Sequence, residues 1–419
     1  MISKLLFRYS YSLLLTLMTS NLVFLEIMGP LSFIVSTTSV AVFCSVIAIF
    51  AYGLKFSRHN LINILLTILS ILIVISALFH PLEHNLLYSI RDIIMIYFII
   101  SMSMIDIKTE ELYKIIRLSI YFVCALIVIL TFYNIFYHLS YTEINDKIYA
   151  DNVVNSIIDY ASGIERERFT FPGINANTTA LILVQLATFS LIISTQSTSS
   201  LEKLVFFVLS LIFLYFMFYT YSKTAIVLLL VCIGLLYYFN IIKFSHLLLI
   251  FASFLFILIM YDDFIIYRVI QISDVLFGTE YSSGVIGRTS DRTESITVSL
   301  GLIVDNPLGI GRSEYGRYLQ SAVGGGEHNN YLYNMIIYGP IFGLFYIIII
   351  LWLFRSVIGV HSVIKHSSDV SLRHLSIIAI ITTIVILLVQ IVAPISTYVM
   401  VLLSLVVLII NSINRNTKI

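Results

Sequence analysis

Long uninterrupted apolar runs recur along almost the whole chain, and no other feature constrains the fold as strongly. Helical runs of about 20 apolar residues match the thickness of the hydrocarbon core of a bilayer. The 419-residue chain is 59% hydrophobic and only 11% charged, and its mean hydropathy is +1.00. A soluble domain of this size has no use for so much apolar surface. The sequence therefore predicts an all-α, polytopic integral membrane protein, with residues 1–419 forming a single membrane domain.

Short polar stretches divide the apolar sequence into about 12 candidate transmembrane helices. Backbone N–H and C=O groups must pair within each run when they lie in hydrocarbon, so helices are expected rather than open strands. The runs cover residues 9–28, 32–52, 61–79, 86–104, 118–137, 176–195, 204–221, 225–241, 246–261, 331–354, 375–392 and 396–411. Cys44, Cys124 and Cys232 fall inside such runs, so neither a disulfide framework nor a zinc site is expected.

Lysine and arginine residues gather at one set of helix ends. This set contains Lys4, Arg8, Lys55, Arg58, Lys108, Lys114, Arg117, Lys203, Lys243, Arg355, Lys365, Arg373, Arg415 and Lys418. The short loops on the other side, near Pro30, residues 80–85 and Pro394, contain neither residue type. Because short cytoplasmic loops carry the excess of Lys and Arg, both termini are predicted to be cytoplasmic.

This orientation leaves two long loops on the outer side, residues 138–175 and 262–330. Both are far longer than a connection requires, so they are candidates for function. The first has apolar residues at helical spacing over 153–161, which predicts an amphipathic helix lying flat in the membrane interface. The second contains a predicted helix over about 291–304, because Asp291 and Glu294 form a capping box and Asn306-Pro307 stops the helix.

Basic residues in the outer segments break the charge rule. They are Arg166, Arg168, Lys223, Arg268, Arg288, Arg292, Arg312 and Arg317. Long translocated loops tolerate positive charge, so a solvated loop surface explains any one of them. The alternative is a clamp for a pyrophosphate, because the planar guanidinium group matches phosphate oxygens and stays charged at any pH.

Two further positions stand out for their surroundings. Arg91 and Asp92 lie one or two turns inside a predicted membrane helix, where charge is costly, and either a structural ion-pair network or a substrate role accounts for them. His328 is the one histidine of the large outer loop and directly precedes Asn329 and an apolar run. It is either a polar cap at the helix entrance or a group that exchanges a proton with a hydroxyl or holds a phosphate. No cluster with metal-ligand spacing lies on the outer side, so metal-independent chemistry without a cofactor is expected.

Four segments of the chain resemble the bacterial O-antigen polymerase and O-antigen ligase superfamily of membrane glycosyltransferases. They are RFTFPGINANTTA (168–180), YSKTA (221–225), GRTSDRTESITVSLGLIVDNPLGIGRSEY (287–315) and HNNYLYNMIIYGPIFG (328–343). Lys223 stands where arginine is usual, and the second glycine of the last segment is one residue later than the strictest pattern. The segments follow one another in the family's order and span roughly the last 250 residues.

The resemblance implies a fold related to the C-type glycosyltransferases and an undecaprenyl-pyrophosphate-linked oligosaccharide as donor. It implies a bacterial inner-membrane protein with a periplasmic active site, with a chain-length regulator protein as a candidate partner and no nucleic acid. His328, Arg288 and Arg292 would be catalytic. The substrate-binding set would be Arg168, Lys223, Arg312, Arg317, Asn329 and Arg91.

Three functions share this donor chemistry, and the sequence favours one of them. A polymerase of O-antigen or a related surface polysaccharide is preferred, because the histidine motif matches the ligase type only approximately and no large extra outer domain is present. An O-antigen ligase that uses lipid A-core as acceptor is the alternative, followed by a protein-glycosylating oligosaccharyltransferase. A transporter is the competitor from another class, but the sequence shows no related halves.

Overall fold

The chain is a bundle of helices in the computed structural model, which describes most of the chain. The described residues are 2–20, 37–53, 60–80, 83–137, 156–158, 165–171, 176–243, 245, 248, 252, 296–311, 314–315, 330–365, 367, 369–392 and 396–416. The helices are α1 (Ile2–Ser20), α4 (Thr37–Tyr52), α5 (Asn60–Phe79), α6 (Glu83–Met104), α7 (Thr109–Tyr137), α9 (Ala176–Gln196), α10 (Ser200–Tyr219), α11 (Lys223–Tyr238), α16 (Asn330–Tyr338), α17 (Pro340–Ile364), α18 (Val370–Val392) and α19 (Ser396–Asn416). A short helix over Ile296–Asp305 adds to them.

Six of the described helices are long and apolar enough to cross a membrane, so the protein is a multi-pass membrane protein. These six are α5, α7, α9, α10, α17 and α18. Shorter apolar helices lie in α4, α11 and α19. Most predicted apolar runs coincide with a helix. The predicted run 246–261 lies almost wholly outside the described residues, so the predicted total of 12 spans stays a prediction.

Helix α9 is the most deeply buried of the six long apolar helices. Nearly all of its residues are buried, and it packs against α10, α18, α11 and α7. Two polar side chains on α9 find partners inside the bundle, since Thr188 donates to the Val184 carbonyl (2.7 Å) and Gln185 reaches Thr382 of α18 (3.4 Å). Many residues of α1, α4, α5 and α10 are instead exposed and apolar, as expected for helices that face lipid.

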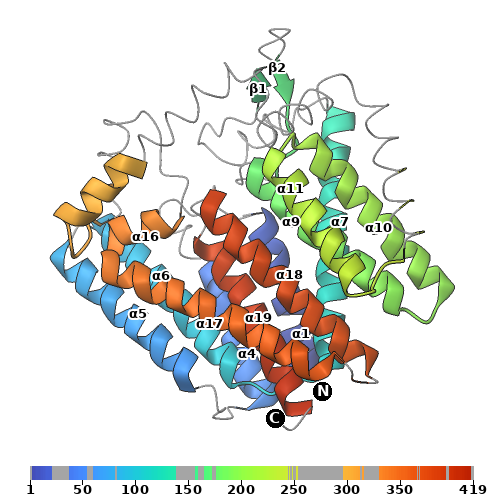
Figure 1. Ribbon diagram of the computed structural model, residues 1–419, viewed down its shortest axis with the longest axis horizontal. Coiled ribbons are helices and arrows are strands. Elements are labelled where there is room, and N and C mark those ends of the chain that lie inside the picture. The colour runs from blue at the N-terminus through green and yellow to red at the C-terminus, as the bar shows by residue number, and fades with distance from the viewer. Residues whose placement is uncertain are drawn as a thin grey trace.

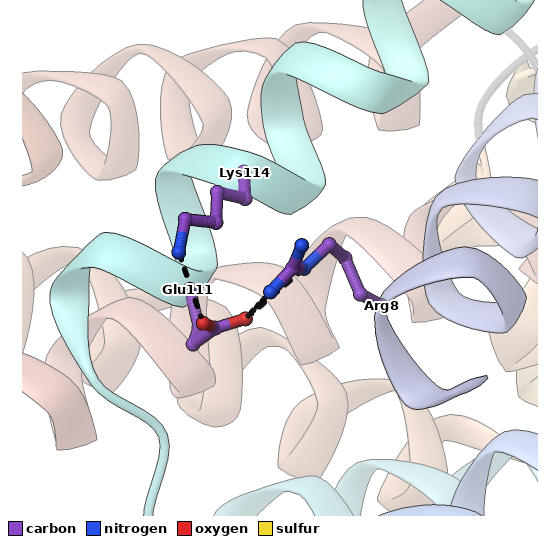
Figure 2. Close-up of polar contacts among 3 residues, drawn as sticks. All are labelled: Arg8, Glu111 and Lys114. Carbon is purple, nitrogen blue, oxygen red and sulfur yellow. Dashed lines mark hydrogen bonds and ion pairs between the residues drawn. The ribbon is translucent and has the colours of Figure 1, made fainter. Parts of the chain in front are cut away.

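Figure 1 shows that α1 begins and α19 ends at the same end of the bundle, which we call the terminal end. Ion pairs tie neighbouring helices together there. Arg8 of α1 pairs with Glu111 of α7 (2.7 Å), Lys114 approaches the same carboxylate (3.3 Å), and Figure 2 shows the three side chains converging. Arg117 of α7 pairs with Glu202 of α10 (2.7 Å). The predicted gathering of basic residues on one side agrees with this placement.

The opposite end of the bundle, which we call the far end, holds a different set of contacts. A two-stranded antiparallel ribbon lies there, formed by β1 (Ser156–Ile158) and β2 (Glu165–Glu167), with Ile157 opposite Arg166 (Figure 1). The prediction of an amphipathic helix over 153–161 is wrong at these positions. Isoleucine is β-branched and favours strands, and the backbone of 156–158 finds its hydrogen-bond partners in 165–167 rather than within a helical turn.

Candidate functional site

The far end contains every predicted site residue that the structure describes. Arg91 lies in α6, Arg168 follows β2, and Lys223 is the first residue of α11. The other predicted site residues lie outside the described part of the chain; they are His328, Arg288, Arg292, Arg312, Arg317 and Asn329. Their roles stay predictions. The described residues near them in the sequence show which helices these segments are bonded to.

Arg168 anchors the chain before α9 to the end of α10. Its Nε donates to the Thr220 carbonyl (2.6 Å) and its Nη2 donates to Asn177 Oδ1 (3.0 Å). The next residue continues the attachment, because the Phe169 N–H donates to the Tyr219 carbonyl (3.0 Å). Phe169 is fully buried. The start of the first resemblance segment (168–180) is therefore bound to the residues that directly precede the second (221–225), and Arg168 makes this attachment.

A tight turn joins α10 to α11 at this anchor. Tyr221 adopts a positive φ of 53°, a left-handed conformation that is uncommon for a residue with a side chain. Hydrogen bonds from the Thr220 N–H to the Met217 carbonyl (3.1 Å) and from the Tyr221 N–H to the Phe218 carbonyl (2.9 Å) close the turn. Lys223 follows Thr220 by three residues, so their Cα atoms lie within about 11 Å of each other. The turn thus brings Lys223 close to the Arg168 anchor.

Helices α16 and α17 form a hairpin at Gly339-Pro340. The rings of Tyr331 and Tyr346 are 6.2 Å apart between centroids. Fifteen residues of a continuous helix would separate them by about 22 Å, so α16 folds back along α17. The prediction of one continuous helix over 331–354 is therefore wrong, because Gly339 adopts a φ of +91° and Pro340 starts a new helix.

The segment after the Ile296–Asp305 helix supplies the hydrogen bonds that this break removes. The Ile336 carbonyl lies in the last turn of α16, so no helical N–H follows to donate to it. The Ile310 N–H donates to that carbonyl instead (2.8 Å). The neighbouring Ile337 carbonyl accepts from the Gly311 N–H (3.2 Å) and from Ser76 Oγ of α5 (3.2 Å). The third and fourth resemblance segments are thereby docked on each other.

Two glycines make this close approach possible. Gly309 and Gly339 both have positive φ angles, +80° and +91°. A Cβ on Gly309 would collide with the Ile337 carbonyl, and one on Gly339 would lie 2.6 Å from the Pro307 carbonyl. Only glycine satisfies both the conformation and the contact distance at these positions.

A buried ionic network from α6 reaches the same hairpin. Arg91 pairs with Asp92 Oδ1 (2.6 Å) and its guanidinium lies over the Tyr88 ring (5.3 Å). The Tyr338 hydroxyl donates to Asp92 Oδ2 (2.6 Å). Arg91, Asp92 and Tyr338 are each less than 9% exposed. These contacts therefore support the interpretation of Arg91 and Asp92 as a structural network. A substrate role for Arg91 stays a prediction.

His80 is a polar residue of the far end that the sequence did not single out. Its Nε2 lies 2.8 Å from the Gly309 carbonyl, and because a carbonyl only accepts, Nε2 carries the proton. A cavity of about 10 Å³, enough for one water molecule, lies beside it. Its lining contains Ser76, Ala77, His80, Tyr88, Ser89, Gly311, Ile337 and Tyr338. The only sequence signal was a histidine in a loop free of Lys and Arg.

The described residues contain no group of three or more His, Cys, Asp or Glu side chains that is placed to hold a metal ion. Tyr331, at the start of α16, is half-buried, and this burial raises the pKa of its phenol above the usual value.

No family model matches the chain. No curated protein matches it either.

Proposed function

We propose that the protein is a membrane glycosyltransferase that joins undecaprenyl-pyrophosphate-linked oligosaccharide repeat units into O-antigen or a related surface polysaccharide. One observation carries the proposal. The four resemblance segments are dispersed over residues 168–343, yet at the far end Arg168 of the first is bound to Thr220, directly before the second, and Ile310 of the third is bound to Ile336 of the fourth. An active site assembled from these segments requires such convergence.

For a protein of the bacterial inner membrane, as proposed, the distribution of charge supports a far end on the periplasmic side. Basic residues of the described helices gather at the terminal end, where Arg8, Lys114 and Arg117 lie. The positive-inside rule then assigns the terminal end to the cytoplasm. A periplasmic far end faces lipid-linked repeat units after they have been translocated.

In the proposed mechanism an acceptor hydroxyl attacks the anomeric carbon of the donor glycan, and the lipid pyrophosphate departs. Arg288 and Arg292 stabilise the negative charge that develops on the departing pyrophosphate, and Arg168, Lys223, Arg312 and Arg317 support them. Fixed cations at a developing charge typically contribute about 100-fold or more in rate. A single displacement inverts the anomeric configuration and requires no metal.

His328 is the proposed group that takes up the proton of the acceptor hydroxyl or orients it near the pyrophosphate, and Asn329 binds the substrate beside it. General-base assistance typically contributes about 100- to 10,000-fold. Holding two lipid-anchored substrates in register supplies much of the rest. The positive charge of Arg91 is neutralised by its ion pair with Asp92 in the described structure. Arg91 is therefore included in the proposed substrate-binding set as a member of this pair.

A reconstituted assay tests the proposal. Wild type, His328→Ala and Arg288→Ala are incubated in liposomes with the lipid-linked repeat unit, with and without lipid A-core. Arg355→Ala serves as the matched control, because Arg355 is an exposed arginine of α17 far along the helix from the hairpin. A ladder of longer lipid-linked glycans without added acceptor, lost in the first two variants and kept in the control, supports the polymerase.

Two other results would redirect the proposal. Product that forms only when lipid A-core is present would make the protein a ligase. Absence of any glycosidic product, together with movement of the lipid-linked substrate across the bilayer, would make it a transporter.

A further inference from the structure

The hairpin between α16 and α17 ends in a tip that is held by a side chain from a distant helix. We propose that Tyr338 and Asp92 are positioning residues, which set the direction of α16 and thereby place the chain that enters it for glycosyl transfer. This inference rests on the proposed function, because His328 lies two residues before the first residue of α16. Neither side chain needs to touch the substrate to act in this way.

Asp92 is the fixed point of the arrangement. Its Oδ1 accepts from Arg91 Nε (2.7 Å) and its Oδ2 accepts from the Tyr338 hydroxyl (2.6 Å), so both oxygens are engaged. The bond to Tyr338 joins α6 to the last residue of α16, 246 positions apart in the chain. A short bond from a phenol to a buried carboxylate is strong and directional, which suits it to fixing an orientation.

Stability alone does not account for this placement. A buried ion pair contributes little net stability, because the desolvation of its charges offsets their attraction. The network nevertheless meets the chain one residue before the Gly339 break, where α16 has no continuous helix to hold its angle. The Ser76 and Ile310 bonds hold the backbone carbonyls at the tip, whereas Tyr338 alone among these contacts ties a side chain of α16 to α6.

Because of the length of α16, a small rotation at its tip, near Tyr338, becomes a large displacement at its first residue, Asn330. Eight residue steps separate Tyr338 from Asn330, which corresponds to about 12 Å of helix. A rotation of about 5° at the tip therefore displaces the start of α16 by about 1 Å. A misplacement of this size can lower a reaction rate on the order of 100-fold.

The first test compares the kinetics of Tyr338→Phe and Asp92→Asn with those of wild type. We expect Tyr338→Phe to lower kcat by about 10- to 100-fold while the KM for the lipid-linked donor changes less than about threefold. Asp92→Asn keeps an acceptor for the hydroxyl and should lose less of kcat. Tyr97→Phe is the matched control, since Tyr97 lies on the exposed face of α6. An unchanged kcat in Tyr338→Phe, or a loss confined to KM, would overturn the assignment.

A disulfide provides a rescue that a purely structural role would not show. A Cβ on Gly343 would overlap the Met335 side chain, so the two positions are adjacent, and Met335→Cys with Gly343→Cys can tie α16 directly to α17. The native Cys44, Cys124 and Cys232 are replaced first. Oxidation should restore most of kcat to the Tyr338→Phe background, and reduction should remove it again. Failure of the oxidised protein to regain activity would contradict the inference.

The rate of this disulfide's formation separates the inference from the proposed function. With copper phenanthroline, the bond should form at least about fivefold more slowly in the Tyr338→Phe background, because α16 samples more orientations. This readout needs no substrate. Equal rates in both backgrounds would overturn the positioning role even if wild type proves to be a polymerase, whereas unequal rates without any glycosyl transfer would refute only the proposed function.

Discussion

Gly309 is the position at which a single methyl group should do most damage to the far end. Its φ of +80° is in the left-handed region, and a Cβ there would collide with the Ile337 carbonyl. The left-handed conformation costs about 1–2 kcal/mol for a residue with a side chain. The collision must also separate the segment from α16, which breaks the bonds that Ile310 and Gly311 donate, each contributing about 1 kcal/mol. Gly309→Ala should therefore lower the free energy of unfolding by about 3–4 kcal/mol.

Equilibrium unfolding in mixed micelles with increasing SDS measures this change. Gly359→Ala is the matched control, because Gly359 lies inside α17 and a Cβ there would meet nothing within 4 Å. Alanine in a helix interior should raise stability by about 0.5–1 kcal/mol. The two substitutions thus have opposite predicted signs for the same chemical change. A loss below about 1 kcal/mol in Gly309→Ala would refute the argued docking of this segment on α16.

Four further outcomes follow from the described contacts and the proposed chemistry. Arg168→Lys should reduce turnover at least about 10-fold in the liposome assay, because an ammonium group cannot donate to Thr220 and Asn177 at once in the geometry of the guanidinium fork. Pro340→Ala should leave the hydrogen-exchange rate of the Ile310 amide unchanged in mass spectrometry, because position 340 lies in the first turn of α17 and its N–H does not reach the Ile336 carbonyl. Glu111→Gln should lower unfolding free energy by less than about 1 kcal/mol in the same micelle titration, since its ion pairs are partly exposed. Chelation with EDTA should leave glycosyl transfer unchanged, as metal-independent chemistry requires.

The helices could be predicted from the sequence because the apolar runs indicate membrane spans. Inside a membrane no water is present to pair with backbone N–H and C=O groups, so a helix is the favoured backbone structure. The same reasoning failed at Gly339-Pro340, where the residues on both sides are apolar and a hydropathy pattern passes through the break. Proline is acceptable in the first turn of a helix, so Pro340 does not by itself distinguish a kink from a hairpin. The ring contact between Tyr331 and Tyr346 decides it, and that contact is tertiary.

The candidate site shows the same division between local and distant information. Arg91 and Asp92 are neighbours, so a network between them could be predicted from the cost of burying charge in a membrane helix. Their partner Tyr338 could not, because no local pattern links residues 246 positions apart. His80 was missed for a similar reason. Its significance comes from the Gly309 carbonyl beside it, which a left-handed turn directs toward α5.

The two ends of the bundle differ in how their polar contacts respond to change. At the terminal end, charged side chains such as Arg8 and Lys114 remain 24% and 48% exposed, so water and salt compete with their ion pairs. At the far end, backbone carbonyls and the carboxylate of Asp92 are buried, and removing a partner leaves a polar group without water to replace it. Substitutions at the terminal end should therefore be tolerated singly, whereas those at the far end should be costly. This asymmetry agrees with the proposed function, in which the terminal end orients the protein in the membrane and the far end holds the reacting groups in one geometry.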